Sequence, residues 1–208
     1  GFRRTGSGRI VARLGRAERD LLASLARQIA TLVAPAPDDA DSDPLARLVG
    51  IEDEAVTPTD PALARLLPDA YGEDEAAKSA DFRRFTERSL REGKVANART
   101  VIETLERSGD KVTLSAAEAQ AWLSGLNDIR LALGARLELA DDPDLTEARI
   151  ADLVEQVADL DPAATGPAAE DALAAAEELA TFQVYDLLTY LQETLVQAVM
   201  APPPRRSG

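Results

Sequence analysis

The side chains best suited to chemistry are three carboxylates, Asp152, Glu155 and Asp159, spaced three and four residues apart. On a helix this spacing places them on one face, and all-α nucleotide hydrolases bind Mg²⁺ with arrays of this kind. The other side of the same segment is apolar, so the pattern also fits the solvated face of an ordinary amphipathic helix. Because a magnesium site needs a second, converging set of carboxylates and the sequence does not identify one, we expect no bound metal and no cofactor.

Two residue types with frequent chemical roles are missing, because the chain contains no Cys and no His. It therefore has no thiol nucleophile, no disulfide and no thiolate ligand. It also lacks the usual general base and the commonest metal ligand, which excludes catalytic triads of the Ser-His-Asp and Cys-His types. No Gly-rich phosphate loop occurs either. We expect a protein without catalytic activity.

The charge distribution restricts the partners. The 208 residues carry a formal net charge of −14, which disfavours general binding of nucleic acid because the phosphates would repel the protein. Basic residues gather in two regions. Residues 1–33 hold seven Arg against two acidic residues, and residues 81–111 hold eight basic residues against six acidic ones.

The first basic region contains four candidate partner-binding residues: Arg3, Arg4, Arg9 and Arg13. Two short runs flank a Gly-Ser-Gly turn at residues 6–8, which predicts a small β-hairpin. Guanidinium groups bind phosphates or carboxylates bidentately, and the net charge favours an acidic protein surface over DNA. We expect a protein partner for this hairpin. The alternatives are pairing with the acidic segment 38–43 of the same chain and direct contact with DNA.

The second basic region surrounds Phe82 and Phe85 on a predicted helix and contains Arg83, Arg84, Arg88, Arg91 and Lys94. It could face phosphates, but Glu87 and Glu92 are interleaved with it. Mixed charges at this spacing are typical of i, i+4 pairs on an exposed helix, which is the interpretation we favour.

Helical periodicity and end signals predict an all-α fold, a helical bundle with a small N-terminal β-hairpin. We expect one domain over residues 1–200, with an acidic, Pro-rich linker at 33–44 and a disordered tail at 201–208. Helices are predicted from Arg16, after Asp43 and Asp60, over about 75–107 with a kink or break at Gly93, after Ser115, up to about Leu160 and after Pro167. Residues 112–114 are predicted to be extended.

The helix after Ser115 has an apolar core stripe formed by Trp122, Leu126, Ile129, Leu133 and Leu137. A second stripe beside it contains Asn127, Arg130 and Gly134. We expect Gly134 to admit a neighbouring backbone, and Asn127 with Arg130 to form a structural polar network at a helix–helix seam. A ligand or partner site built from the same pair is the alternative. Asp128 is expected to face away from both stripes.

The last helix also has a long apolar stripe, which contains Leu173, Val184, Leu188, Leu191, Leu195 and Val199. We expect this helix and the helix of Trp122 to form the central pair of the fold. The stripe is wide enough to serve a homodimer seam as well as the core.

Four blocks carry a resemblance to a known family: LARLLPDAY, REGKVANARTVIETL, WLSGLNDIRLALGARLEL and VYDLLTYLQETLVQAV. They resemble the actinobacterial oxidative-stress transcriptional regulators of the AosR family, long classed as a domain of unknown function, over about residues 2–199. The resemblance implies a non-enzymatic, cytoplasmic regulator that contacts the transcription machinery, such as RNA polymerase or a sigma factor. Some members sense oxidants through cysteines, a mechanism that this chain does not share. A direct DNA-binding regulator and a carboxylate- and Mg-dependent nucleotide hydrolase are the alternative functions.

The cytoplasm is also the expected location on the basis of the sequence itself. No run of about eighteen apolar residues occurs, and no export signal is recognisable near the N-terminus.

Overall fold

The computed structural model describes residues 1–34, 58–68, 76–139, 143–158 and 166–202. Three of the expected features fall largely or wholly outside these ranges: the linker from residue 35 onward, the helix after Asp43 and the tail from residue 203 onward. Asp159 lies outside them as well.

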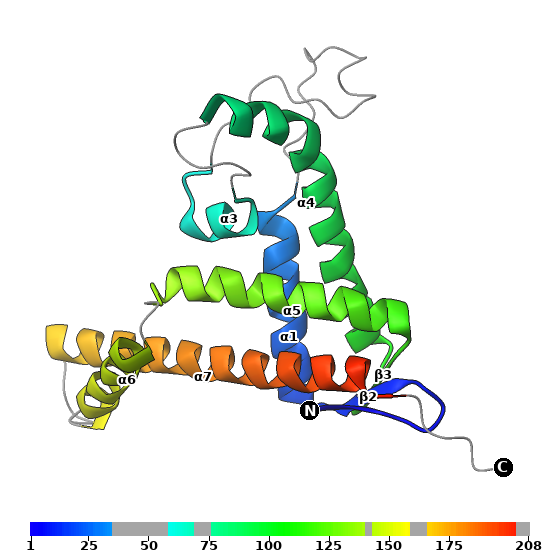
Figure 1. Ribbon diagram of the computed structural model, residues 1–208. Helices are drawn as coiled ribbons and strands as arrows, with labels where there is room; N and C mark the ends of the chain where they lie inside the picture. The colour runs from blue at the N-terminus through cyan, green and yellow to red at the C-terminus, as the bar shows by residue number, and fades with distance from the viewer. Residues whose placement is uncertain (35–57, 69–75, 140–142, 159–165, 203–208) are drawn as a thin grey trace.

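Within the described ranges the chain forms six helices and one three-stranded sheet, which confirms the predicted helical bundle with its N-terminal hairpin (Figure 1). In chain order the elements are β1 (Phe2–Arg4), β2 (Ile10–Arg13), α1 (Arg16–Leu32), α3 (Pro61–Leu66), α4 (Ala76–Glu106), β3 (Lys111–Leu114), α5 (Ala116–Arg136), α6 (Pro143–Ala158) and α7 (Pro167–Met200).

The predicted hairpin acquires a third strand. β1 and β2 pair antiparallel with Phe2 opposite Ala12, and the turn between them uses Gly8 at a φ of 80°, a conformation that glycine adopts without strain. A two-stranded hairpin alone is only marginally stable in water. The predicted extended segment, β3, adds to the other edge of β2 with Leu114 opposite Ile10, so that the sheet order is β1-β2-β3.

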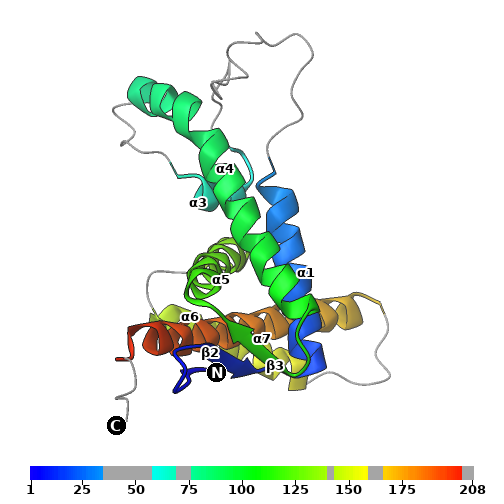
Figure 2. The same cartoon turned by 90° about the vertical axis from the view of Figure 1, so that its right-hand side faces the viewer.

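Helix α5 lies at the centre of the molecule and packs against α1, α3, α4 and α7. In Figure 1, α5 and α7 run side by side across the molecule, as predicted for the central pair, while α1 crosses them. Figure 2 shows α1 and α4 side by side, both extending away from α7. This arrangement surrounds α5 on several sides, so that most of its faces are covered by neighbouring elements.

The side chains of α5 explain this central position. Of the predicted core stripe, four residues are buried and Leu133 is partly buried. The indole N–H of Trp122 donates to Thr104 Oγ1 at 2.7 Å, and the Trp122 ring meets the ring of Phe2 edge to face at 5.4 Å between centroids. The N-terminus of α5, predicted to follow Ser115, has a capping box between Ser115 and Glu118. The core therefore joins the sheet to the helices.

Two glycines differ from their predictions. Of the predicted kink or break at Gly93, the break does not occur, because α4 continues through this residue; a helical glycine costs only about 0.5–1 kcal/mol, and packing against α1 and α5 outweighs this cost. The axis of α4 is bent in the N-terminal half of the helix (Figure 1). The close backbone approach predicted at Gly134 does not occur, and the tightest contact of a glycine in α5 lies on the opposite side of the helix. A Cβ on Gly134 would meet only side chains at 3.4 Å or more, whereas a Cβ on Gly125 would lie 3.0 Å from Val101 of α4.

Candidate protein-binding surface

The candidate arginines divide between the two faces of the sheet. Arg4 is half-buried, and its guanidinium donates to the carbonyl oxygen of Ala201 after α7. Arg3 and Arg13 are exposed. Paired and alternating positions of an antiparallel sheet share a face, so Arg3 (opposite Val11) and Arg13 (two residues after Val11) lie on the same face.

Strand β3 contributes a fourth cation to this side of the sheet. Lys111 is exposed and lies opposite Arg13 in the register of β2 and β3, although 98 positions separate the two residues in the chain. Arg9, which is exposed, stands at the turn end of β2. Val11 is only 3% exposed at the centre, where the aliphatic parts of long cationic side chains can cover it. We call Arg3, Arg9, Arg13 and Lys111 the basic face.

Two residues of the second basic region, Arg91 and Lys94, form ion pairs. Arg91 pairs with Glu87 one turn earlier at 2.6 Å, and both side chains are largely buried. Lys94 pairs with Asp128 of α5 at 2.6 Å. The predicted i, i+4 pairing is therefore present at Arg91, but the pair is largely buried and not on a solvated face as expected. The side chains of Arg83 and Arg84 are outside the described part.

The Lys94–Asp128 pair is the main polar feature that the sequence did not predict. Asp128 was expected to face away from both stripes of α5, but it is 3% exposed because α4 covers this third side of the helix. Burial raises the pKa of the Asp128 carboxyl above its usual value, while the hydrogen bond and charge of Lys94 act in the opposite direction. Lys94 is the partner that makes this buried carboxylate tolerable.

A polar hollow of about 320 Å³ lies over this ion pair between α4 and α5. Besides the pair itself, its lining consists of Ser89, Leu90, Gly93, Asn97, Ser124 and Asn127. Asn127 is exposed on the rim of the hollow. Gly93 lies in this lining and has open space where a side chain would stand.

Arg130, one turn after Asn127, joins α5 to α7. Its guanidinium donates to Gln192 Oε1 at 2.8 Å and to Tyr185 Oη at 3.2 Å, and its Cζ atom lies 5.1 Å from the centroid of the Tyr185 ring. The structure thus places Arg130 in a polar seam between α5 and α7, and Asn127 beside α4.

The described members of the predicted carboxylate array lie on the surface of α6. Asp152 and Glu155 are exposed, and Asp152 accepts a hydrogen bond from Gln156. Among the residues that the structure describes, no group of three or more acidic side chains is placed to hold a metal ion. In the same part of the chain, no helix combines the length and the apolar character needed to cross a membrane.

Comparison with known proteins identifies relatives along most of the chain. Residues 1–199 match the family described as "Domain of unknown function (DUF2017)". The chain is 31% identical over 197 residues to the protein named "Oxidative stress regulator AosR" of Mycobacterium tuberculosis, covering 88% of this chain and 78% of that protein. It is 33% identical over 172 residues to the "Putative oxidative stress regulator AosR" of Mycobacterium leprae, covering 76% and 68%.

No solved structure matches the chain. The family match and the mycobacterial relatives agree with each other and with the four sequence blocks. The chain therefore belongs to the AosR-like actinobacterial family described as a domain of unknown function (DUF2017).

Proposed function

We propose that the protein is a non-enzymatic, cytoplasmic regulator of a stress response, and that it acts by binding another protein through the basic face of its sheet. The names of the mycobacterial relatives support the regulatory part of the proposal. The observation that carries the binding surface is the gathering of Arg3, Arg13 and Lys111 from three strands onto one exposed face.

An acidic protein surface is the partner that this geometry suits best. Residues 1–14 contain four Arg and no acidic residue, so the hairpin attracts carboxylates locally. DNA contact would bring the rest of a chain with net charge −14 towards the phosphates. A protein partner can instead be met over the small area of one sheet. RNA polymerase or a sigma factor is the proposed partner, in keeping with a role in transcription.

A pull-down from the native cytoplasm tests this proposal. We expect wild-type protein to retain RNA polymerase or a sigma factor, and the Arg3→Glu/Arg9→Glu/Arg13→Glu variant to lose it, because the variant replaces three exposed positive charges by negative ones. Arg65→Glu is the matched control, since Arg65 is exposed on α3, away from the sheet. Arg4 is left unchanged because it bonds to Ala201 and supports the fold.

Two results would contradict the proposal. The first is that wild-type protein retains neither RNA polymerase nor a sigma factor. The second is that wild type and the triple variant retain them equally. Sequence-specific DNA binding by the isolated protein at physiological salt, with a steep dependence on salt concentration, would instead identify a direct DNA-binding regulator.

The hydrolase alternative leads to a separate prediction. We expect no Mg-dependent hydrolysis of nucleoside triphosphates above the level of a buffer blank, because Asp152 and Glu155 lie on an exposed helix face without a converging second set of carboxylates among the described residues. Release of pyrophosphate or phosphate measures this. Turnover that is present in wild type and abolished by Asp152→Asn and Glu155→Gln would show that the protein is an enzyme.

A further inference from the structure

The apolar stripe of α7 that could have formed a homodimer seam is largely used inside the molecule. Leu188, Leu191 and Leu195 are at most 1% exposed and belong to the main core, and Val184 and Val199 pack against that core. A second copy of the chain cannot reach these side chains without unfolding the first. Self-association through α7 would therefore have to use a different face of the helix.

Such a face exists, and α6 covers only half of it. One stripe at spacings of three and four residues runs through residues 172, 175, 179, 182, 186, 190, 193, 197 and 200. In the first half of α7, Ala175 and Phe182 are buried in a small cluster with Leu153 of α6. In the second half, Tyr190 is 52% exposed and Met200 79% exposed. Figure 1 shows α6 beside the N-terminal part of α7 only.

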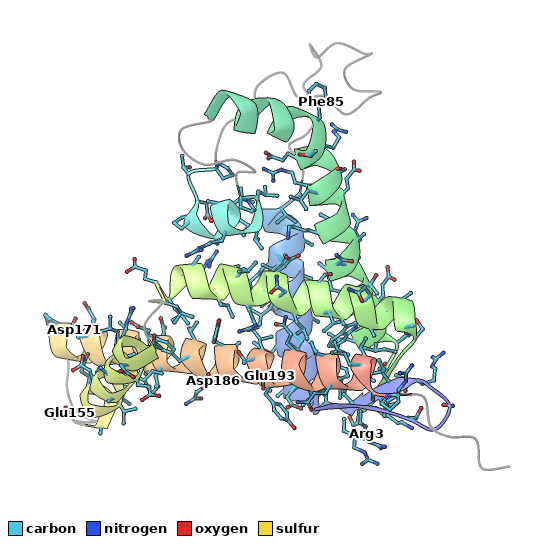
Figure 3. The ribbon with its side chains drawn as sticks, viewed as in Figure 1. Arg3, Phe85, Glu155, Asp171, Asp186 and Glu193 are labelled. Carbon is cyan, nitrogen blue, oxygen red and sulfur yellow. The ribbon has the colours of Figure 1, made fainter. Side chains whose placement is uncertain are left out.

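Charges of opposite sign lie near the two ends of α7. Helix α6 and residues 167–182 of α7 together contain eight acidic residues and one Arg, whereas the hairpin of residues 1–14, near the other end, contains four Arg and no acidic residue. The hairpin is fixed beside the C-terminal part of α7, where the backbone N–H of Phe2 donates to Thr194 Oγ1 at 3.0 Å. Figure 3 shows Arg3 at this end and Glu155 and Asp171 at the other. A helix of 34 residues is about 51 Å long, so the two charged ends are well separated.

We propose that the uncovered face of α7 binds the same face of a second copy in antiparallel orientation. In a two-fold symmetric interface each contact occurs twice with the roles of the copies exchanged. An antiparallel arrangement places the acidic end of each copy beside the basic face of the other, whereas a parallel arrangement places like charges together. Each α6 then lies beyond the C-terminal end of the partner's α7, next to the partner's sheet, and Tyr190 and Met200 lose their exposure to water.

The dimer is expected to be reversible rather than permanent. Asp186 and Glu193 are exposed on the same side of α7, so the dimer brings acidic side chains of the two copies closer together, which opposes association. The dimer also covers the basic face. Self-association and binding of an acidic partner would therefore exclude each other.

Charge-reversal variants test the dimer. Size-exclusion chromatography with light scattering, at several protein concentrations, measures the mass of each variant and of wild type. We expect the wild-type mass to rise towards twice that of the monomer as concentration increases. Arg3→Glu/Arg13→Glu and Glu155→Arg/Asp171→Arg should each stay monomeric. An equimolar mixture of the two variants should dimerise again. In the mixed dimer, the native acidic end of one variant meets the native basic face of the other, and at the second contact both sides have reversed charge and still attract each other. All four residues are exposed, so unchanged circular dichroism should confirm that both variants fold.

A monomeric wild type at every concentration would overturn the proposal, and so would a mixture that stays monomeric. A dimer that survives in both separate variants would show that another surface is used. Arg65→Glu, which reverses one exposed charge on α3, should dimerise like wild type. The acidic-end variant also separates this inference from the proposed function: it keeps the basic face, so it should remain monomeric and still retain the protein partner.

Discussion

Replacing Leu126 by Asp is expected to unfold the protein. The Leu126 side chain is completely buried at the centre of α5, the helix that contacts α1, α3, α4 and α7. An Asp at this position would place a carboxylate among apolar side chains and leave a space where the leucine packed, a combined loss of about 4–5 kcal/mol or more. Native domains are stable by only about 5–15 kcal/mol, so a loss of this size unfolds a domain near the lower end of that range and removes much of the stability of any other.

Far-UV circular dichroism and urea denaturation measure this effect. Leu131→Asp is the matched control, because Leu131 belongs to the same helix but is 37% exposed. A carboxylate at that position can reach water, so its effect should be within about 1 kcal/mol. If Leu126→Asp and Leu131→Asp had equal stabilities, α5 could not be the central helix of the core.

Removing Lys94 has the second largest expected effect. Lys94→Met keeps the length and apolar part of the side chain but leaves Asp128 buried without its ion-pair partner, which typically costs about 3–5 kcal/mol. Replacing both residues, as Lys94→Met/Asp128→Leu, should recover most of this loss, because buried ion pairs are often no more stabilising than well-packed apolar residues. Urea denaturation of both variants and wild type gives the comparison.

The loss caused by Lys94→Met should depend on pH. Burial raises the pKa of Asp128, so the folded protein holds this proton more tightly than the unfolded chain, and the contribution of Asp128 to stability falls as the pH rises between the two pKa values. Without Lys94 the two effects that lower this pKa disappear and the interval widens. We therefore expect a small difference from wild type in acid, where Asp128 is protonated, and a large one at neutral pH.

A pH-independent loss in Lys94→Met would contradict this account, since it would arise from altered packing rather than from an unpaired carboxylate. Asp128→Asn provides the check: because its amide does not ionise in this range, the pH dependence attributed to Asp128 should vanish in that variant.

The local elements of the fold could be predicted because their causes are local. Ser115 and Glu118 cap the start of α5 within four residues, and Asp60 caps α3 by accepting from the backbone N–H of Leu63 at 2.8 Å. The turn at residues 6–8 needs only the conformational freedom of Gly8. In each case neighbours in the chain supply both partners of the interaction, so residue types and spacing were sufficient.

The features that were missed depend on partners that are distant in the chain. Asp128 follows the polar Asn127 in the sequence and lies off the apolar stripe, but its burial comes from α4, which reaches it through Lys94, 34 residues away. The close approach falls at Gly125 rather than Gly134 because α4 crosses α5 near Val101. The helical wheel of α5 shows which faces are apolar, but it does not show which polar face a neighbouring helix will cover.

Features of the functional surface also divide into those that depend on residue type alone and those that depend on partners distant in the chain. Composition alone removed thiol and histidine chemistry, and the run of arginines in residues 1–14 marked a basic hairpin. Only the tertiary structure added Lys111 through the pairing of β3, assigned Arg4 to the other face, and left half of one α7 face uncovered. Residue types fix which interactions a chain can make, whereas the packing of distant segments determines which of those side chains remain exposed for a partner.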